Sequence, residues 1–311
     1  MCSAVTLLTP TRSPDEQAAA LLEGAGLCAM EHLSVLAVGG ADRASWLNGL
    51  VTNDVRALPP GASVYAAAVA VKGKILTDLH VTAAGDELLV VMPAERRDEV
   101  AAHFDRYVVM EDVTLTPRDL LVFTAQGPRA RELSPAVGHV ARNDRLGGGG
   151  VDVHVAPDEL AAFIEWARGA ELRGELVIAG AEAWERARVV AGVARFGVDF
   201  DVSNFVQEAS ITPRAVSFQK GCYLGQEVVC RLEMRGHVQR RLVSLRVEGA
   251  PPPRGAAVTA DGKTVGEVSS VSAWGSGAAM IAMVRYAALE SRAPLEVDGR
   301  PVTVVDPGSA G

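Results

Sequence analysis

Residues 220–227 read KGCYLGQE, and this stretch holds more residues of chemical interest than any other part of the 311-residue chain. Two glycines enclose Cys222, and glycine allows a backbone to turn sharply and to approach a ligand or a partner closely. The residues QEVVCRLEMR at 226–235 have the pattern of a short helix that begins after Gly225. We therefore expect Cys222 in a tight turn just before the N-terminus of a helix.

The surroundings of Cys222 favour its thiolate form, because Lys220 lies two residues away and a helix N-terminus carries partial positive charge. Such a cysteine is a candidate nucleophile, redox sensor or single metal ligand, and the plainer alternative is a buried, inert thiol. Cys230 shares an apolar helical face and is expected in the core, Cys28 in a buried segment and Cys2 in a loose terminus. The cysteines and the six dispersed histidines match no common metal-binding spacing, so we expect no tightly bound metal.

Positive charge in this chain is carried almost entirely by arginine. Only four of the 30 basic residues are lysine, and three of these lie beside the glycines of two short loops, at 72–74 and 220–221. Lysine is a compact, flexible point charge, so either these loops need something that arginine does not supply or the pattern is chance. A separate basic stretch comprises Arg231, Arg235, His237, Arg240 and Arg241. It either receives an anionic tail, such as the glutamates of a folate, or forms a solvated helix face.

The periodicity of the remaining sequence predicts an α+β protein. Ser13 to Glu16 form a capping box with proline at the first helical position, which marks a helix start. Further hydrophobic patterns predict helices at 14–23, 41–51, 94–107, 157–168 and 181–191, and strands at 33–38, 63–71, 75–82, 87–92, 113–123 and 151–155. The order of elements over about 33–123 is typical of a ferredoxin-like element.

The sequence pattern changes past Arg241, where short segments of alternating apolar and polar residues are separated by prolines and glycines. This pattern is typical of a small all-β barrel or sandwich. We expect an α+β body of two intertwined modules at 1–242 and a C-terminal β-barrel domain at 243–311.

The composition excludes several classes of protein. A chain that is 49% hydrophobic and 22% charged can bury a sizeable core, which rules out global disorder. A net charge of −8 repels nucleic-acid phosphates, so direct nucleic-acid binding is not expected. The N-terminus lacks the features of a signal peptide, no apolar run reaches the ~20 residues of a membrane span, and the few cysteines suit a reducing compartment. We expect a cytoplasmic protein without membrane contact.

The eight residues at 220–227 resemble the signature of the YgfZ family, folate-binding-type proteins of iron–sulfur cluster maintenance. That family is similar to the T-protein, the aminomethyltransferase of the glycine cleavage system. The resemblance covers most of the chain through WLNGLVTNDV at 46–55, KGKILTDLHV at 72–81, RVVAGVARFGVDFD at 188–201 and VGEVSSVSAWGSGAAMIAMV at 265–284.

The resemblance implies three modules around a central funnel that can accept tetrahydrofolate, and a role in assembling or repairing [4Fe–4S] enzymes, including radical enzymes that modify tRNA. The expected partners are iron–sulfur client enzymes or assembly factors. The expected catalytic residues are Cys222, Lys220 and Asp78. The expected cofactor-contacting residues are Asn53, Asp54, Tyr223, Gln226, Glu227, Glu208 and Arg231.

Two positions depart from the T-protein pattern. The paired acids of the T-protein appear here as Thr77 and Asp78, so one carboxylate for positioning and proton transfer is missing. The glutamate that reads the pterin ring is replaced by Val190, which cannot accept the ring's N–H donors. Folate binding is therefore expected to be weaker, or to use another acid such as Glu208.

Three functions follow as alternatives. The leading hypothesis is an auxiliary protein of iron–sulfur cluster assembly or repair in which Cys222 ligates a transferred iron, forms a mixed disulfide or contacts a client. The second is a folate-dependent aminomethyltransferase or other one-carbon transferase. The third is an interaction module whose folate site has decayed.

Overall fold

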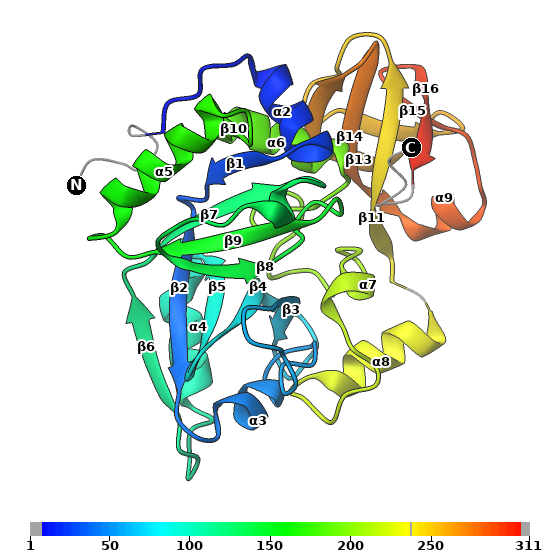
Figure 1. Ribbon diagram of the computed structural model, residues 1–311. Helices are drawn as coiled ribbons and strands as arrows, with labels where there is room; N and C mark the ends of the chain where they lie inside the picture. The colour runs from blue at the N-terminus through cyan, green and yellow to red at the C-terminus, as the bar shows by residue number, and fades with distance from the viewer. Residues whose placement is uncertain (1–7, 237, 306–311) are drawn as a thin grey trace.

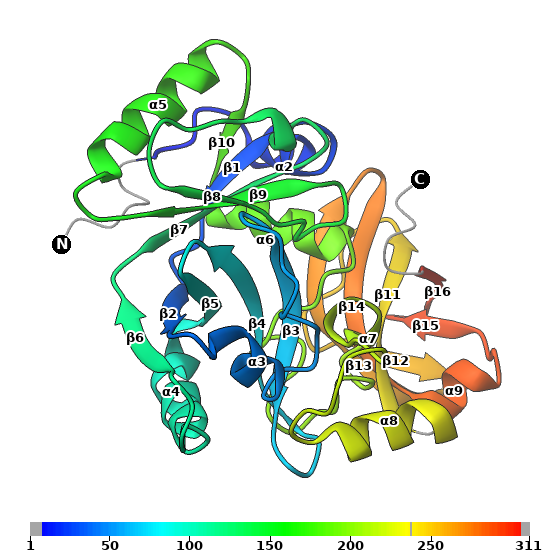
Figure 2. The same cartoon turned by 60° about the horizontal axis from the view of Figure 1, so that its bottom comes forward.

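The computed structural model describes residues 8–236 and 238–305, so Cys2 and His237 lie outside the described residues. The chain forms two five-stranded sheets and one closed six-stranded barrel, arranged side by side (Figures 1 and 2). The expected α+β architecture with a C-terminal β-barrel is confirmed. Within the described part of the chain, no helix is long and apolar enough to span a membrane.

The first sheet is antiparallel, with the strand order β3-β4-β5-β2-β6. Its elements are β2 (Leu33–Gly39), α3 (Arg43–Asn48), β3 (Ser63–Val69), β4 (Ile75–Ala84), β5 (Glu87–Pro93), a 3₁₀ turn (Ala94–Arg96), α4 (Arg97–Asp105) and β6 (Thr114–Arg118). The run β2–α3–β4–β5–α4–β6 is the expected ferredoxin-like element, which β3 extends at one edge. Trp46 of α3 and Phe104 of α4 bury one face of this sheet, with their ring centroids 6.0 Å apart.

The second sheet has the order β10-β1-β7-β9-β8, and only the β1–β10 pair is parallel. Its elements are α2 (Pro14–Glu23), β1 (Gly26–Ala29), β7 (Leu121–Gln126), a 3₁₀ turn (Ala130–Glu132), β8 (His139–Arg142), β9 (Gly150–Val155), α5 (Leu160–Leu172), β10 (Val177–Ala179) and α6 (Ala181–Val190). Helix α5 covers one face. Helices α2 and α6 pack on the other face, in a core shared with the first sheet.

Two sequence-based element predictions are wrong. The single strand expected at 113–123 is two strands, β6 and β7, which belong to different sheets. Residues 119 and 120 carry the chain from one sheet to the other, and no glycine marks this crossing. The helix expected from Pro157 begins instead at Leu160, after a turn at 157–159 in which the Ala156 amide donates to the Glu159 carboxylate. By contrast, α2 has the predicted bounds and its capping box is formed.

The barrel has the order β11-β14-β13-β12-β15-β16. Its elements are β11 (Arg240–Glu248), β12 (Ala257–Ala260), β13 (Lys263–Trp274), β14 (Gly277–Arg285), α9 (Tyr286–Glu290), β15 (Leu295–Val297) and β16 (Arg300–Val305). Alternate side chains of these strands fill its interior. Residues 191–239, between α6 and β11, form the linking segment, which holds α7 (Thr212–Ala215) and α8 (Gln226–Arg235). Buried side chains of this segment join the barrel to the inner face of the first sheet.

Candidate functional site

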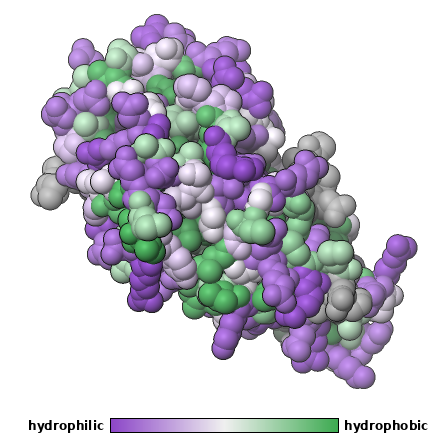
Figure 3. Space-filling model, turned by 90° about the horizontal axis from the view of Figure 1, so that it is seen from below, coloured by the Kyte–Doolittle hydropathy of each residue, from purple (hydrophilic) through white to green (hydrophobic). Residues whose placement is uncertain are grey.

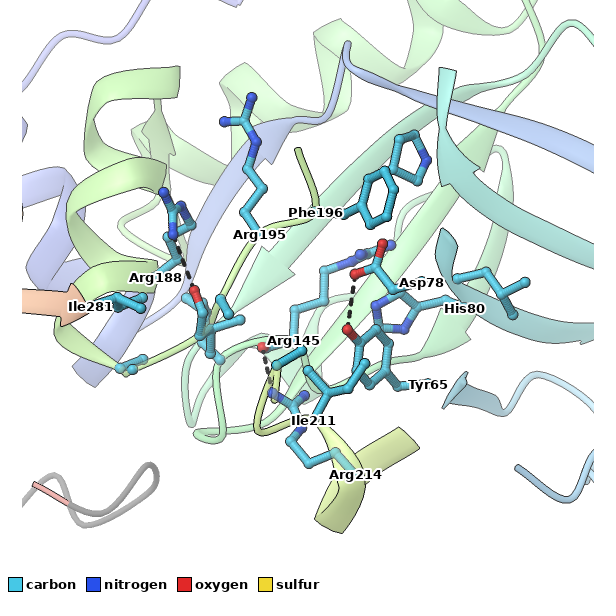
Figure 4. Close-up of a pocket in the computed structure, with 18 of the residues that line it drawn as sticks. Tyr65, Asp78, His80, Arg145, Arg188, Arg195, Phe196, Ile211, Arg214 and Ile281 are labelled. Atoms are coloured by element: carbon cyan, nitrogen blue, oxygen red, sulfur yellow. Dashed lines mark hydrogen bonds between the residues drawn. The ribbon is translucent and has the colours of Figure 1, made fainter. Parts of the chain in front are cut away.

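A cavity of about 250 Å³ lies where the two sheets, α6, the linking segment and the barrel meet (Figure 4). This volume is near the lower end of small-molecule sites, which span roughly 300–1,000 Å³. Side chains at alternate positions of β3 and β4 point to the inner face of the first sheet, so Tyr65, Asp78 and His80 all line the cavity. The walls are mixed, with apolar residues such as Phe196 and Ile281 beside charged ones.

Asp78 and Glu95 are the two acids that line this cavity, and Asp78 lies on its β4 wall. The hydroxyl of Tyr65 donates a hydrogen bond of 2.8 Å to its Oδ2. Burial raises the pKa of Asp78 to about 6, against the opposing effects of the Tyr65 hydrogen bond and the Arg145 charge. Burial also raises the pKa of Tyr65 well above its usual value, so the phenol stays a donor. Asp78 is therefore an acceptor at neutral pH that can take up a proton in mildly acidic conditions.

Two histidines of the cavity are neutral near pH 7. Burial, reinforced by Arg145, lowers the pKa of His80 well below its usual value. Burial and the Arg195 charge lower the pKa of His32 to about 4. The His80 ring lies 4.9 Å from the Tyr65 ring, centroid to centroid. These side chains add polar, uncharged surface to the cavity.

Four arginines line the cavity, and three of them are neutralised. Arg145 pairs with the fully buried Asp152 at 2.7 Å. Arg188 pairs with Asp199 and Glu185, and Arg195 also pairs with Glu185. Arg214 differs, because its guanidinium donates to the main-chain carbonyls of residues 144 and 145 and has no carboxylate partner among the described residues. Arg214 thus leaves an uncompensated positive charge at the cavity wall.

We expect Asp78→Asn to remove a pH dependence of stability. The carboxyl has a pKa of about 6 in the folded chain and of 3.8 when unperturbed, so the folded state binds its proton more tightly. Its stabilising effect is present below about pH 4 and is lost as the pH rises through 6. Between pH 4 and pH 7 the wild type should lose about 2 kcal/mol relative to the variant in urea unfolding. Parallel pH profiles of the two proteins would contradict this assignment.

The signature loop lies beside α3 and is fixed by Lys220. Its ammonium is buried and donates to the carbonyls of Asn48 at 2.6 Å, Val51 at 2.6 Å and Asn53 at 2.7 Å. Burial lowers the pKa of Lys220 to about 8, so the ammonium keeps its charge and all three donors at pH 7. The three carbonyls surround one small cation, and this explains why position 220 is lysine. A planar guanidinium cannot direct its donors at three carbonyls around a single point. The idea that Lys220 serves the thiolate of Cys222 is not supported, since its donors are occupied by these carbonyls.

The rest of the loop is also held in place. Tyr223 is buried, and its amide binds the side-chain oxygen of Gln226 at 3.2 Å. The amide of Leu224 donates to the carbonyl of Gly49 at 2.9 Å. Gly225 has φ +79°, and a Cβ there would lie 2.5 Å from the carbonyl oxygen of Ala70, so glycine is required at the start of α8. Helix α8 spans 226–235 as predicted.

Cys222 is exposed, which excludes the alternative of a buried, inert thiol. Cys28 is buried, as predicted, and Cys230 is half-buried on α8. Glu227 is exposed in the first turn of the same helix. Among the described residues, no three His, Cys, Asp or Glu side chains are grouped so that they could hold a metal ion. The loop therefore presents one accessible thiol on a fixed backbone.

The other expected cofactor residues occupy different places. Asn53 lies next to the cavity, where its amide donates to the carbonyls of Tyr65 at 2.9 Å and Arg214 at 3.0 Å. Asp54 is half-buried and paired with Arg56. Arg231 is exposed on α8 and does not line this cavity.

Glu208, which was expected as a substitute for the missing pterin-reading acid, lies outside the cavity. It is buried, accepts the Phe205 amide at 3.0 Å, and its carboxylate lies 3.7 Å from Lys74 and 3.8 Å from Arg240. It does not line the cavity. Val190 does not line it either, because it packs in the core between the linking segment and the barrel.

Of the ten expected site residues, only Asp78 lines the cavity, and Asn53 contacts its wall through Tyr65 and Arg214. The signature loop forms a second region, joined to the first through the 48–53 segment that Lys220 holds. Sequence reasoning missed Tyr65, His80 and Arg214. His80 had a usable signal, because it stands two residues after Asp78 on a strand and so shares its face. Arg214 had none, since its role depends on a distant loop.

The fold and this site define a class: an α+β protein of three modules around a central cavity. The solved structure of the glycine cleavage system aminomethyltransferase T from Bartonella henselae has the same fold, with a TM-score of 0.79 over 95% of this chain and 89% of that one, at 18% identity.

Sequence comparison shows which domains and proteins the chain is similar to. Residues 11–146 match the GCVT N-terminal domain, and residues 239–311 match the CAF17 C-terminal β-barrel domain. The chain is 29% identical to an aminomethyltransferase of Rubrobacter xylanophilus, covering 79% of this chain and 72% of that protein. It is 28% identical to the tRNA-modifying protein YgfZ of Cronobacter sakazakii, covering 73% of each. The chain thus combines a match to the GCVT N-terminal domain with a match to the CAF17 C-terminal β-barrel domain, and it is similar both to YgfZ proteins and to aminomethyltransferases.

Proposed function

We propose that this protein assists the assembly or repair of [4Fe–4S] clusters in client enzymes, and that it supports tRNA modification through those clients. The proposal is supported by the YgfZ relatives, which are named tRNA-modifying proteins, and by the signature at 220–227. The observation that carries it is Cys222, an exposed thiol on a loop whose neighbours Lys220, Tyr223 and Leu224 are all held by buried contacts. A fixed, accessible thiol can meet a partner without rearrangement of the loop.

Exposed apolar side chains accompany this loop. Phe218, two residues before Lys220, is 45% exposed, and Val71 is 65% exposed. Val71 belongs to the β3–β4 turn, which packs against the start of α8 because Gly73 leaves room for Val228. Viewed from below, the side on which α3 and α8 lie, apolar side chains gather in small groups between polar ones (Figure 3). We propose that a protein client docks on this face, since exposed apolar groups are typical of interaction sites.

Cys222→Ala is expected to abolish the function without unfolding the chain. The exposed side chain contributes little to packing, so the free energy of unfolding should change by less than about 0.5 kcal/mol. In a strain that lacks its own YgfZ-like protein, the wild type should restore the activity of [4Fe–4S] enzymes and the alanine variant should not.

Two matched variants sharpen this test. Cys222→Ser keeps the size and polarity of the side chain but not its thiol chemistry, so it should fail like alanine if the thiol reacts or binds iron. Cys230→Ala changes the nearby half-buried cysteine and should restore full activity. Complete rescue by Cys222→Ala would refute the role of the thiol.

We propose that the cavity holds one ring of a folate-type ligand. Its apolar walls and the Asp78 carboxylate suit a flat ring that carries hydrogen-bond donors. Tetrahydrofolate, when bound, supplies nitrogen atoms that carry one-carbon groups. In this chain Asp78 would accept a donor of the ring, Tyr65 would orient Asp78, and Arg214 would attract an anionic part of the ligand. We propose tetrahydrofolate as the cofactor of this cavity.

The cavity also supports a second candidate function, a folate-dependent one-carbon transferase. Asp78 is placed to exchange a proton near neutral pH, because its pKa is about 6. The position of the partner acid is Thr77, whose side chain is fully buried and hydrogen-bonded to the Asp78 carbonyl. Thr77 cannot take part in proton transfer, which favours the first proposal. Turnover of an aminomethyl donor with tetrahydrofolate would favour the one-carbon transferase over the role in cluster assembly. Failure to bind tetrahydrofolate at about 100 μM, or −5.5 kcal/mol, would exclude the transferase.

A further inference from the structure

Strand β9 divides its side chains between two different surroundings. Val151, Val153 and Val155 pack in the apolar core beneath α5. The alternate residues Asp152 and His154 therefore point to the opposite face, which is turned toward the first sheet and its strand β4. Both of these side chains are at most 1% exposed. One end of the contact between the two sheets is thus a buried polar layer.

The acid of this layer is well paired. The Asp152 carboxylate accepts hydrogen bonds from the guanidinium of Arg145 at 2.7 Å and from the side-chain amide of Asn143 at 2.7 Å. Both donors belong to the connection between β8 and β9. This connection also forms part of the cavity wall, which Arg145, Leu146 and Gly147 line. The polar layer and the cavity wall are therefore held by the same residues.

The histidines of the layer lack such partners. Among the described residues, neither ring nitrogen of His154 makes a hydrogen bond, and the same holds for the buried Nδ1 of His80 and Nε2 of His139. His139 of β8 is the cross-strand neighbour of His154, and the two rings stack with their centroids 6.0 Å apart. Buried polar atoms without partners are rare and costly, so this cluster weakens the contact between the sheets.

The surroundings of the cluster keep its imidazoles neutral. Burial lowers the pKa of His154 to about 4 and the pKa of His80 well below its usual value. Asp152 opposes both shifts, and Arg145 reinforces them. The charged and titratable groups packed around the three histidines are Tyr65 of β3, Asp78 of β4, Asp152 of β9, Arg145 of the connection and Arg214 of α7.

The hairpin at 139–155, made of β8, the connection and β9, is free to move at its outer strand. Strand β8 is the edge of its sheet and pairs there with β9. Toward the first sheet, the Arg142 amide donates to the Gly61 carbonyl at 2.7 Å, beside a single bridge between Ala62 and Arg142. An edge strand of this kind can separate from a neighbouring sheet without breaking the order of its own sheet.

We infer that the hairpin at 139–155 is an acid-sensitive wall of the cavity. At neutral pH the uncharged imidazoles of His80, His139 and His154 let it close against the first sheet. In mild acid the protonated rings need water, and they obtain it when β8 moves away from β4. The connection that carries Arg145 moves with the hairpin, so the cavity opens. The inference concerns the chain alone and needs neither the proposed cofactor nor a client.

The direction and size of the effect follow from proton linkage. The pKa of His154 is about 4 in the closed hairpin and 6.5 for an unperturbed imidazole, so the open form binds more protons. The closed form keeps its full stability above about pH 6.5 and loses it as the pH falls toward 4. Between pH 7.5 and pH 5, His154 alone should raise the opening equilibrium about thirtyfold. Asp78 acts in the opposite direction, because its pKa is raised to about 6, but it is the same in all variants compared below.

Backbone hydrogen exchange at pH 7.5 and pH 5, corrected for the intrinsic exchange rate, tests this inference. In the wild type the protection of β8 and β9 should fall about thirtyfold or more, and that of β14 in the barrel by less than about threefold. His154→Phe keeps a flat ring that cannot be protonated, so the loss of protection in the hairpin should shrink about thirtyfold. His154→Gln, polar and also without charge, should act in the same way, and urea unfolding at pH 7.5 shows that each variant is folded. His103→Phe on α4, outside the layer, is the control and should match the wild type.

Three results would overturn the inference. Equal protection of the wild-type hairpin at both pH values would show that it does not open in acid. An equal loss in the wild type and in both His154 variants would assign the acid sensitivity to other groups. A loss of the same size in the barrel would indicate general acid unfolding instead of movement of the hairpin. Because no folate or client is present, none of these results bears on the proposed function.

Discussion

Replacing Lys220 with methionine is expected to lower the free energy of unfolding by about 3 kcal/mol, because the carbonyls of Asn48, Val51 and Asn53 lose their common charged donor. Methionine fills a similar volume, so the cost reflects the lost hydrogen bonds and not a cavity. Two of these three bonds lie in the buried interior, where water cannot replace the ammonium. Urea unfolding measures the effect, and complementation should fail as well, since the loop around Cys222 depends on this anchor.

The Lys220→Arg variant separates the effect of the positive charge at position 220 from the effect of the side chain's shape. A guanidinium keeps the positive charge but is larger and planar, so we expect a loss of about 1–3 kcal/mol from overpacking and misdirected donors. Lys263→Met is the matched control, because Lys263 is exposed at a barrel turn and should change stability by less than about 0.5 kcal/mol. An unfolding midpoint of Lys220→Met equal to that of the wild type would refute the role of the ammonium.

Arg188→Met should cost about 3–5 kcal/mol, because it leaves the Asp199 carboxylate buried without its charged partner. Arg188 of α6 donates to Asp199 at 2.7 Å and to Ser270 of the barrel at 2.9 Å. Asp199 also accepts the hydroxyls of Ser269 and Ser270. These bonds join α6 to β13, so we also expect the barrel to unfold in a separate transition in the variant, as tryptophan fluorescence and circular dichroism can show.

Two further variants control this prediction. Arg186→Met alters the next arginine of the same helix, whose pairs with Asp15 and Glu182 lie at the surface, and should cost less than about 1 kcal/mol. The double variant Arg188→Met with Asp199→Asn should cost clearly less than the sum of the single changes, since the unpaired charge is then absent. Additive costs would show that the buried pair is not coupled.

Much of the local structure could be predicted from sequence because its causes are local. The capping box from Ser13 to Glu16 sets the start of α2, and alternation in 240–305 indicates a barrel. The predictions of secondary structure failed where the structure depends on residues distant in the sequence. Strands β6 and β7 look like one strand in the sequence. They are separate because β6 pairs with β2 and β7 pairs with β1, and neither partner is visible from the local sequence. The short strands β1, β8 and β10 were missed because three or four residues carry too little periodicity.

The features of the candidate site also divide into those that depend on local sequence and those that depend on distant residues. Asp78 was identified from its segment, and its place in the cavity follows from the face of one strand. The surroundings that raise its pKa to about 6 were not predictable, because the side chains that bury it come from both sheets and the linking segment. Tyr65, whose hydrogen bond opposes this rise, comes from another strand. Glu208 was likewise a reasonable substitute acid by residue type. In the folded chain its carboxylate lies near Lys74 and Arg240 instead of lining the cavity.

The sequence by itself determined the signature loop, the α+β class, the barrel and the exceptional use of lysine at position 220. Only the tertiary structure decided what that lysine does, which arginines remain without a carboxylate, and that Cys222 and Asp78 belong to separate regions. The reason is physical. Propensity and periodicity act over a few residues, whereas burial and electrostatic pairing depend on groups that only folding brings together.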